Sequence, residues 1–272
     1  MAKAIISSTY NDIYLWNIPL VTWAWNRLGV DVICFMPQLF RDGKSNYETQ
    51  SKIDLINRII IEQNLNIRLY TFECPEHKEA TYAQCLRNYA ACLDLPENEV
   101  LITSDVDMLL LQLPFWFNNT TMTVIGSDLV PNGQFPQCYI VGDVVHWREA
   151  FNLNGKTYQR AIDELLGEDE CEHYRGNRWS VDQEQSFLNI SKVNHNLIPR
   201  AKEGTQWATR RYDRDDSYIL DRLNPDTIDY HLNRPGYEEK NFAIIMEVLK
   251  YHFPQEDFTW LRTYNEQYKQ LL

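Results

Sequence analysis

The sequence predicts an α/β fold in which a mostly parallel sheet is flanked by helices. Apolar segments of strand length alternate with segments of helical periodicity through the first hundred residues, and this alternation is typical of parallel α/β units. The chain has 272 residues, of which 44% are hydrophobic. A chain of this length buries about three quarters of its surface on folding, so we expect a self-sufficient core rather than intrinsic disorder.

Three or four strand and helix pairs are expected before residue 110. The expected strands are Ala4–Thr9, Val30–Met36, Ile67–Phe72 and Val100–Ser104. The expected helices are Ile18–Leu28, which Gly29 ends, Ile53–Asn64 and Ala80–Leu93. Their apolar residues recur at helical spacing, whereas the strand segments are short and rich in branched residues. This order makes a nucleotide-binding sheet the default architecture.

The pattern is less regular after residue 110. Strands are expected at Thr121–Gly126 and Cys138–Val145, and helices at Arg148–Leu166, Ser180–Ile190 and Phe242–Phe253, the last packed against the sheet. The charged segments Gly167–Arg178 and Arg200–Asp221 are interpreted as a loop and a solvated excursion. Without an internal repeat or a linker, we expect one domain over residues 1–272, with a nucleotide-sheet half (1–110) and an irregular acceptor-side half (111–272).

The charge balance argues against several partners. Lys and Arg number 26 and Asp and Glu number 38, so the formal net charge is −12. Because no basic block is present, we expect no nucleic-acid partner and no anionic membrane surface. No stretch approaches the roughly 20 apolar residues of a membrane span, and the start lacks the features of a signal peptide. We therefore expect a soluble, cytoplasmic protein; its oligomeric state is left open.

The segment Val100–Leu110 carries the clearest chemical signal. Its apolar strand ends in Asp105-Val106-Asp107, which places two carboxylates at the carboxyl edge of a parallel sheet, where ligands of α/β proteins bind. In an extended chain, residues two apart point to the same side, so both carboxylates are expected to face one volume. Two close carboxylates repel each other unless a cation lies between them, and Mg²⁺ or Mn²⁺ suits such oxygen ligands. The alternative is a turn that merely favours aspartate.

Together with this motif, further segments resemble the GT-A glycosyltransferases, and specifically the glycogenin-like, metal-dependent enzymes. The segment Tyr82–Ala91 is similar to the family's helix whose arginine reaches the donor sugar and diphosphate, which implies that role for Arg87. Asp182 and Gln183 resemble the acidic-Gln pair that lines the sugar pocket. The alternatives are an exposed arginine laid along the surface and acidic residues that complement a helix dipole.

A late segment, Ile228–Lys240, resembles the part of the family that completes the metal and phosphate sites. There the resemblance implies that His231 is a further metal ligand, beside Asp105 and Asp107. Imidazole favours Mn²⁺ over Mg²⁺, although a lone histidine is more often a structural hydrogen-bonding group. Either Arg234 or Lys240 would hold the diphosphate.

Residues at the ends of two strands complete the implied donor site. Ser8, Thr9 and Tyr10 follow the first strand, where the family holds the nucleobase and ribose. Small hydroxyls and an aromatic plane suit these groups, but they are also ordinary loop residues. Ser104 and Val106 flank the first aspartate of the motif and are expected beside the donor.

The sequence departs from the family ahead of Trp147, where an Asn-Ala-Gly segment is replaced by residues 137–146, QCYIVGDVVH. This leaves the donor sugar and the acceptor chemistry open. The resemblance favours retention of the anomeric configuration. An inverting enzyme would instead require a carboxylate base on the acceptor side, and Asp182, Asp143 and Asp128 are the candidates.

The resemblance implies a hexosyl- or pentosyltransferase that uses Mn²⁺, or Mg²⁺. It would move a sugar from a nucleotide-sugar donor, expected to be a UDP-sugar, to a glycan or other hydroxyl acceptor. A nucleotide-sugar pyrophosphorylase is one alternative, but it requires a Gly-rich basic loop after the first strand, and residues 7–12 contain neither Gly nor Lys. A non-catalytic carbohydrate-binding protein is the other, because 13% of the residues are aromatic.

Overall fold

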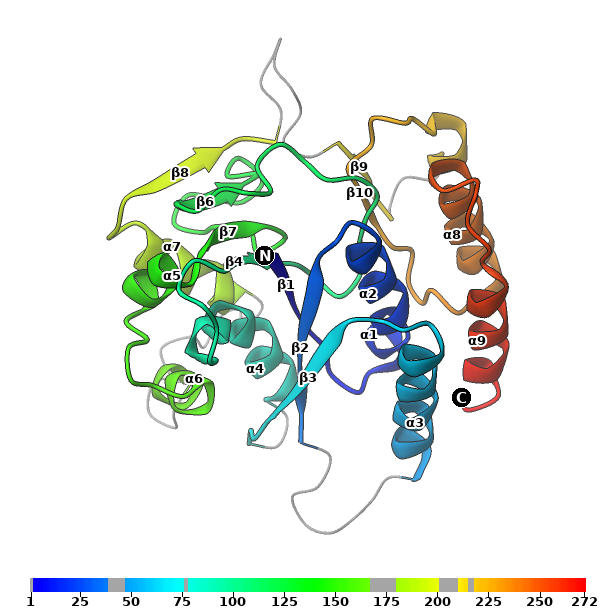
Figure 1. Cartoon of the computed structure of the whole chain (residues 1–272), viewed down its shortest axis with the longest axis horizontal. Helices are drawn as coiled ribbons and strands as arrows, with labels where there is room; N and C mark the ends of the chain where they lie inside the picture. The colour runs from blue at the N-terminus through cyan, green and yellow to red at the C-terminus, as the bar shows by residue number, and fades with distance from the viewer. Residues whose placement is uncertain (1, 39–46, 76–77, 167–179, 201–209, 215–217) are drawn as a thin grey trace.

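The computed structural model describes residues 2–38, 47–75, 78–166, 180–200, 210–214 and 218–272. It confirms the α/β fold: a seven-stranded central sheet has the order β3-β2-β1-β4-β7-β6-β8 (Figure 1). The strands are β1 (Ala2–Ser7), β2 (Asp31–Pro37), β3 (Ile67–Phe72), β4 (Val100–Thr103), β6 (Met122–Ile125), β7 (Ile140–Asp143) and β8 (His195–Ile198). Neighbouring strands are parallel except at β7, which runs antiparallel to β4 and β6.

Helices cover both faces of this sheet (Figure 1). On one side lie α1 (Asp12–Leu15), α2 (Asn17–Arg27), α3 (Tyr47–Glu62), α8 (Glu239–His252) and α9 (Thr259–Lys269). On the other lie α4 (Glu79–Leu86), the 3-10 helix η1 (Arg87–Cys92), α5 (Val144–Phe151), α6 (Tyr158–Leu166) and α7 (Val181–Ile190). Alternate residues of β1 feed the two cores, because Ala4 and Ile6 pack in one and Ile5 in the other. No helix in the described ranges has the length and apolarity required to cross a bilayer.

A second, three-stranded sheet lies beside the central one. It consists of β5 (Met108–Leu110), β10 (Asp229–His231) and β9 (Arg211–Tyr212) in the order β5-β10-β9, with η4 (Ile219–Arg222) between the last two in sequence. The expectation of a solvated excursion over 200–221 is therefore wrong at β9, where Tyr212 is buried. Residues 201–209 and 215–217, and the loop expected at Gly167–Arg178, lie outside the described residues.

Some helix boundaries differ from those expected. The single helix predicted over Arg148–Leu166 is two helices, α5 and α6, because Asn152 adopts a left-handed conformation at φ 51° and ends α5. The helix predicted over Ala80–Leu93 tightens into η1 from Arg87. Phe253, the residue that follows α8, packs on Trp23 of α2 with the ring centroids 5.3 Å apart. The last helix, α9, was not among the expected elements.

Candidate active site

A cavity of about 350 Å³ lies where the carboxyl ends of β1 and β4 meet. The two ends are adjacent because Ser104 N donates to Ile5 O at 2.9 Å. Most of the site residues predicted from sequence line this cavity: Ser8, Thr9, Arg87, Asp105, Val106, Asp107, Asp182, Gln183, His231 and Arg234. Segments that are far apart in the sequence thus contribute to one volume.

Five residues predicted from the sequence do not line the cavity: Tyr10, Ser104, Lys240, Asp143 and Asp128. The Tyr10 hydroxyl donates to Pro37 O, and Tyr14, not Tyr10, is the aromatic residue of this segment in the cavity wall. Ser104 is buried beneath the wall, with its carbonyl accepting from Arg87 Nη1 at 3.2 Å. Lys240 is exposed on the first turn of α8.

Asp143, expected as a candidate base, lies at the opposite edge of the sheet. In the antiparallel pairing of β7 with β4, Asp143 faces Val100, the first residue of β4. Asp105 lies just beyond the other end of β4, which ends at Thr103. Its Oδ1 accepts from His146 N at 3.0 Å and caps α5. Asp143 is therefore a helix cap, separated from the cavity by the length of β4.

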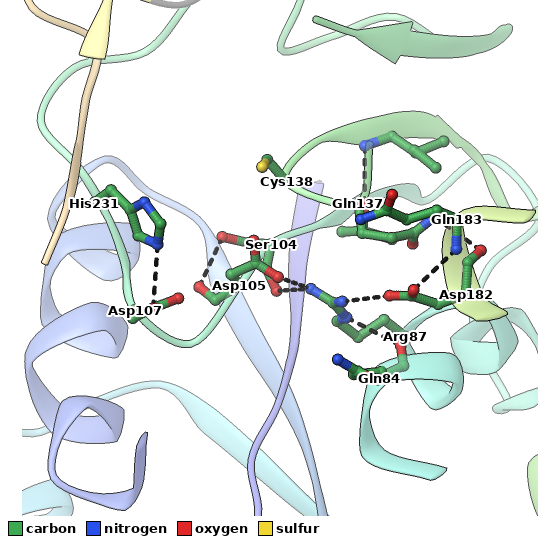
Figure 2. A network of polar contacts seen from close by, with 12 residues as sticks. Gln84, Arg87, Ser104, Asp105, Asp107, Gln137, Cys138, Asp182, Gln183 and His231 are labelled. Carbon is green, nitrogen blue, oxygen red and sulfur yellow. Dashed lines mark hydrogen bonds and ion pairs between the residues drawn. The ribbon is translucent and has the colours of Figure 1, made fainter. Parts of the chain in front are cut away.

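Arg87 lies at the centre of the first charge cluster (Figure 2). Its Nη1 donates to Asp105 Oδ1, and its Nη2 donates to Asp182 Oδ2 at 2.9 Å. The Arg87 side chain is 5% exposed and that of Asp182 is 3% exposed, so this ion pair is almost fully desolvated. The structure thus rejects the alternative of an exposed Arg87 and leaves it facing two carboxylates in the cavity wall.

The environment shifts the pKa values in this cluster. Burial raises the pKa of Asp182 to about 6, against the opposing charge of Arg87, because desolvation penalises the ionised form. Burial alone would lower the pKa of Arg87, but the charges of Asp105 and Asp182 outweigh it and raise that pKa. Arg87 therefore stays charged, and Asp182 is protonated more readily than an ordinary aspartate.

Asp107 belongs to a second cluster. Its Oδ2 lies 2.8 Å from Arg214 Nη1, 3.1 Å from Arg234 Nε and 3.3 Å from His231 Nε2. The extended Asp105-Val106-Asp107 geometry expected from sequence is wrong, because Val106 and Asp107 form a turn after β4. The two carboxylates consequently have different cationic partners (Figure 2), although both line the same cavity.

Asp107 and His231 shift each other's pKa in opposite directions. Burial would raise the pKa of Asp107, but the hydrogen bond and charge of His231, together with Arg234, lower it. Burial would lower the pKa of His231, but its hydrogen bond to Asp107 and the charge of that carboxylate raise it. The pair therefore favours a carboxylate facing an imidazolium when no other cation is bound.

Two arginines in the cavity wall were missed in the sequence. Arg211 forms a bidentate ion pair with Asp229, at 2.8 Å through Nε and 3.1 Å through Nη2, and Arg214 reaches Asp107. Both belong to the segment RRYDRDD, whose charge density was interpreted as a solvated surface. The alternation of a charged and an aromatic residue at Arg211 and Tyr212 is compatible with a strand. Because β9 has only two residues, however, the sequence shows no recognisable strand pattern there.

Part of a metal site is assembled in the cavity. Within the described ranges, no three His, Cys, Asp or Glu side chains are already grouped in a metal-binding arrangement. Two adjacent ligands at about 2.1 Å from an ion stand roughly 3 Å apart, which fits the 3.3 Å between Asp107 Oδ2 and His231 Nε2. The donor set of carboxylate and imidazole also suits Mn²⁺. The residues present therefore fit a divalent cation, provided that Asp107 exchanges its arginine partners for it.

No protein-family model matches the sequence, and no curated protein matches it. The structure is similar to that of the galactosyltransferase LgtC in complex with donor and acceptor sugar analogues, with a TM-score of 0.53 and 9% identity over 96% of this chain and 99% of that one. It is also similar to an active-site variant of LgtC in which glutamate replaces a glutamine, with a TM-score of 0.51 and 9% identity over 90% and 94% of the two chains. The chain therefore has the GT-A fold of these glycosyltransferases.

Proposed function

We propose that this protein is a glycosyltransferase that moves a sugar from a nucleoside-diphosphate sugar, expected to be a UDP-sugar, to a hydroxyl acceptor with Mn²⁺. The observation that carries the proposal is one cavity that joins the Asp107 and His231 pair to the arginine-bound carboxylates Asp105 and Asp182. Such a cavity combines groups for a cation, a diphosphate and a sugar. The fold of LgtC, which binds donor and acceptor sugar analogues, supports the same function.

Asp105, Asp107 and His231 would hold the cation. A bound divalent cation supplies electrostatic stabilisation of the negative charge that develops on a leaving diphosphate. The chain's own cations contribute to the same end, because Arg214 and Arg234 both reach Asp107 Oδ2 at the cavity wall. A diphosphate placed there offers each arginine charge-assisted hydrogen bonds.

An exchange of partners at Asp107 follows from this geometry. One oxygen, Oδ2, already contacts Arg214, Arg234 and His231, so it has no free lone pair for a metal ion. When a diphosphate draws the two arginines to itself, Oδ2 of Asp107 becomes free to bind the cation. Nucleotide and cation are then expected to bind more tightly together than separately.

The nucleoside would lie beside the residues that follow β1. Ser8, Thr9 and Tyr14 line this part of the cavity, and the guanidinium carbon of Arg234 lies 5.0 Å from the centre of the Tyr14 ring. The cation on one face of Tyr14 holds the ring in place. Small hydroxyls and a fixed aromatic plane suit a ribose and a pyrimidine base.

The sugar would lie against Arg87, Asp182 and Gln183. In LgtC, a variant with an altered glutamine is described as an active-site mutant. We propose a similar place in the active site for Gln183, which lines the cavity. Asp182 Oδ1 accepts from Gln183 N at 2.9 Å and its Oδ2 from Arg87, so both carboxylate oxygens are directed by the protein. These residues would orient the sugar's hydroxyls during transfer.

Retention of the anomeric configuration remains the preferred stereochemical outcome. Of the three carboxylates considered as an inverting base, Asp182 lines the cavity. Asp143 lies at the far sheet edge, and Asp128 Oδ1 accepts from Arg200 N at 2.6 Å. The ion pair of Asp182 with the buried Arg87 instead favours a role in orienting the sugar.

A donor screen tests the proposed function. The protein is incubated with Mn²⁺ and a panel of UDP- and GDP-sugars, and released nucleoside diphosphate is measured, with thermal shifts recorded for UDP, GDP and Mn²⁺. We expect diphosphate release from at least one donor and a cation-dependent stabilisation by its nucleotide. Release of pyrophosphate from a nucleoside triphosphate and sugar phosphate would instead indicate a pyrophosphorylase. Sugar binding without any response to nucleotide would indicate a carbohydrate-binding protein.

A further inference from the structure

Gln137 is a buried amide in the cavity wall, just ahead of β7. It is 3% exposed, and it lines the same cavity as Asp182 and Gln183. Its Nε2 donates to Ser186 Oγ at 2.6 Å and to Asp182 O at 3.2 Å. Because main-chain carbonyls only accept, the contact with Asp182 O fixes which end of the amide is the NH₂ group.

The other end of this amide is unsatisfied. Gln137 Oε1 is buried and accepts no hydrogen bond from any described residue. A buried carbonyl oxygen without a donor is unfavourable because it has lost its hydrogen bonds to water, so native proteins rarely keep one unless a water or a ligand supplies the donor. Ser186, which is fully buried and also accepts from Asn88 Nδ2 at 3.0 Å, holds the amide from behind. The amide is thus held in one orientation while its acceptor has no donor.

We infer that Gln137 Oε1 accepts a hydrogen bond from a hydroxyl of the transferred sugar, an inference that rests on the proposed function. The position of Gln137 assigns it to the sugar rather than to the diphosphate. Figure 2 places Gln137 beside Asp182 and Gln183, while Asp107 and His231 lie on the other side of Arg87. Gln137 therefore determines specificity on the sugar side of the cavity.

The chemistry of this position limits the donor class. An amide oxygen requires a hydrogen-bond donor, so a sugar with a free hydroxyl at that carbon is accepted. A deoxy sugar leaves Oε1 unpaired, and a carboxylate would face both Oε1 and the carboxylate of Asp182. The donor sugar therefore presents a neutral hydrogen-bond donor, such as an unsubstituted hydroxyl, at the carbon that faces Gln137.

Deoxy donor analogues test this inference against the Gln137→Met variant, which keeps the length of the side chain and removes the acceptor. With the best natural donor, each ring hydroxyl is removed in turn and kcat/KM is measured for both proteins. In the unmodified protein, loss of one particular hydroxyl should lower kcat/KM about 10- to 100-fold. With the full donor, kcat/KM of Gln137→Met should be lower than that of the unmodified protein by a similar factor. With the deoxy analogue that lacks this hydroxyl, kcat/KM of the variant should fall no further. Its affinity for UDP, measured by calorimetry with Mn²⁺, should be unchanged.

Gln112→Met is the matched control, because Gln112 Nε2 also donates to a main-chain carbonyl, Thr227 O at 3.1 Å, but lies outside the cavity wall. It should discriminate among the analogues as the unmodified protein does. If Gln137→Met does not fold, Ser186→Ala releases the amide and should reduce the same discrimination. If removal of each sugar hydroxyl lowers kcat/KM equally in the unmodified protein and in Gln137→Met, this inference is overturned while the proposed function stands. Absence of transfer from every donor would overturn the proposed function and this inference with it.

Discussion

His231 Nε2 lies 3.3 Å from Asp107 Oδ2 because β10 pairs antiparallel with β5, which sets His231 opposite Met108, the residue after Asp107. A main-chain contact strengthens this arrangement, since Leu232 N donates to Asp107 O at 2.9 Å. The proposed metal pair is therefore held by backbone pairing on both sides. This rigidity makes the consequences of single substitutions at the pair predictable.

Replacing either motif aspartate should abolish turnover. Asp105→Asn and Asp107→Asn each remove a ligand charge without changing side-chain volume, and we expect losses of about 10²- to 10³-fold or more in kcat. Diphosphate release with saturating donor and Mn²⁺ measures the effect, and circular dichroism checks the fold. Asp54→Asn is the control, because Asp54 is exposed on α3 and lies outside the cavity wall. Full activity in either motif variant would contradict the metal site.

His231→Ala should affect the cation more than the fold. Loss of a ligand should raise the Kd for Mn²⁺ at least about 10-fold, as measured by electron paramagnetic resonance of free Mn²⁺ in the presence of UDP. The melting temperature should change by less than about 4 °C, because the His231 side chain is at the cavity wall and not in the core. A large fall in melting temperature with unchanged Mn²⁺ affinity would identify His231 as a structural hydrogen-bonding residue.

Arg214→Gln should weaken the coupling between Mn²⁺ and UDP. In the unmodified protein, UDP should increase Mn²⁺ affinity, in part because the diphosphate takes Arg214 and Arg234 from Asp107. The variant has one arginine fewer to exchange, so the ratio of Mn²⁺ affinities with and without UDP should fall several-fold. Calorimetric titrations in both orders measure this ratio, which must be the same for either order of binding.

The same titrations separate exchange from simple charge repulsion. Loss of a positive charge near the cation would raise Mn²⁺ affinity equally with and without UDP, and the ratio would not change. An unchanged ratio in Arg214→Gln would therefore contradict the exchange at Asp107 while leaving the metal site intact.

The product should retain the anomeric configuration of the donor. The anomeric coupling constant in the proton NMR spectrum of the first-formed product gives the answer directly. Inversion, combined with an inactive Asp182→Asn variant that binds donor normally, would instead identify Asp182 as a base. Retention with that same variant inactive would fit a role for Asp182 in orienting the sugar.

His252 should make stability depend on pH. Burial lowers the pKa of His252 to about 4, below the value near 6.5 of an unfolded chain. The unfolded state therefore binds the proton more tightly than the folded state. The contribution of neutral His252 to the free energy of unfolding is complete above pH 6.5 and is lost as the pH falls toward 4. After allowance for partial exposure, the loss should be about 1 kcal/mol. Urea unfolding of His252→Gln and of the unmodified protein at pH 7 and pH 4.5 should show a smaller decrease in the variant.

Local patterns in the sequence were sufficient for six strands of the central sheet, but not for β8, and for many of the residues that line the cavity. β3 has the predicted bounds, and β4 ends one residue earlier than expected. The position of Asp105 after a buried strand is a local property, because a strand's carboxyl end is set by where its apolar run stops. Arg87 was identifiable for a similar reason, since a cation among apolar helix residues requires an anionic partner.

The tertiary structure alone decided which side chains meet. Arg214 and Gln137 were not identified from sequence, because each reaches the cavity through contacts with segments distant in the chain, Asp107 and Ser186. Asp143 was misplaced for a related reason: the antiparallel direction of β7, which its residues do not reveal, sends its carboxyl end to the far edge of the sheet. Residue type and spacing specify strands and helices, whereas strand direction and the turn after β4 depend on which distant segments pair. The chemistry of the cavity, including the three contacts on Asp107, therefore arises only from that pairing.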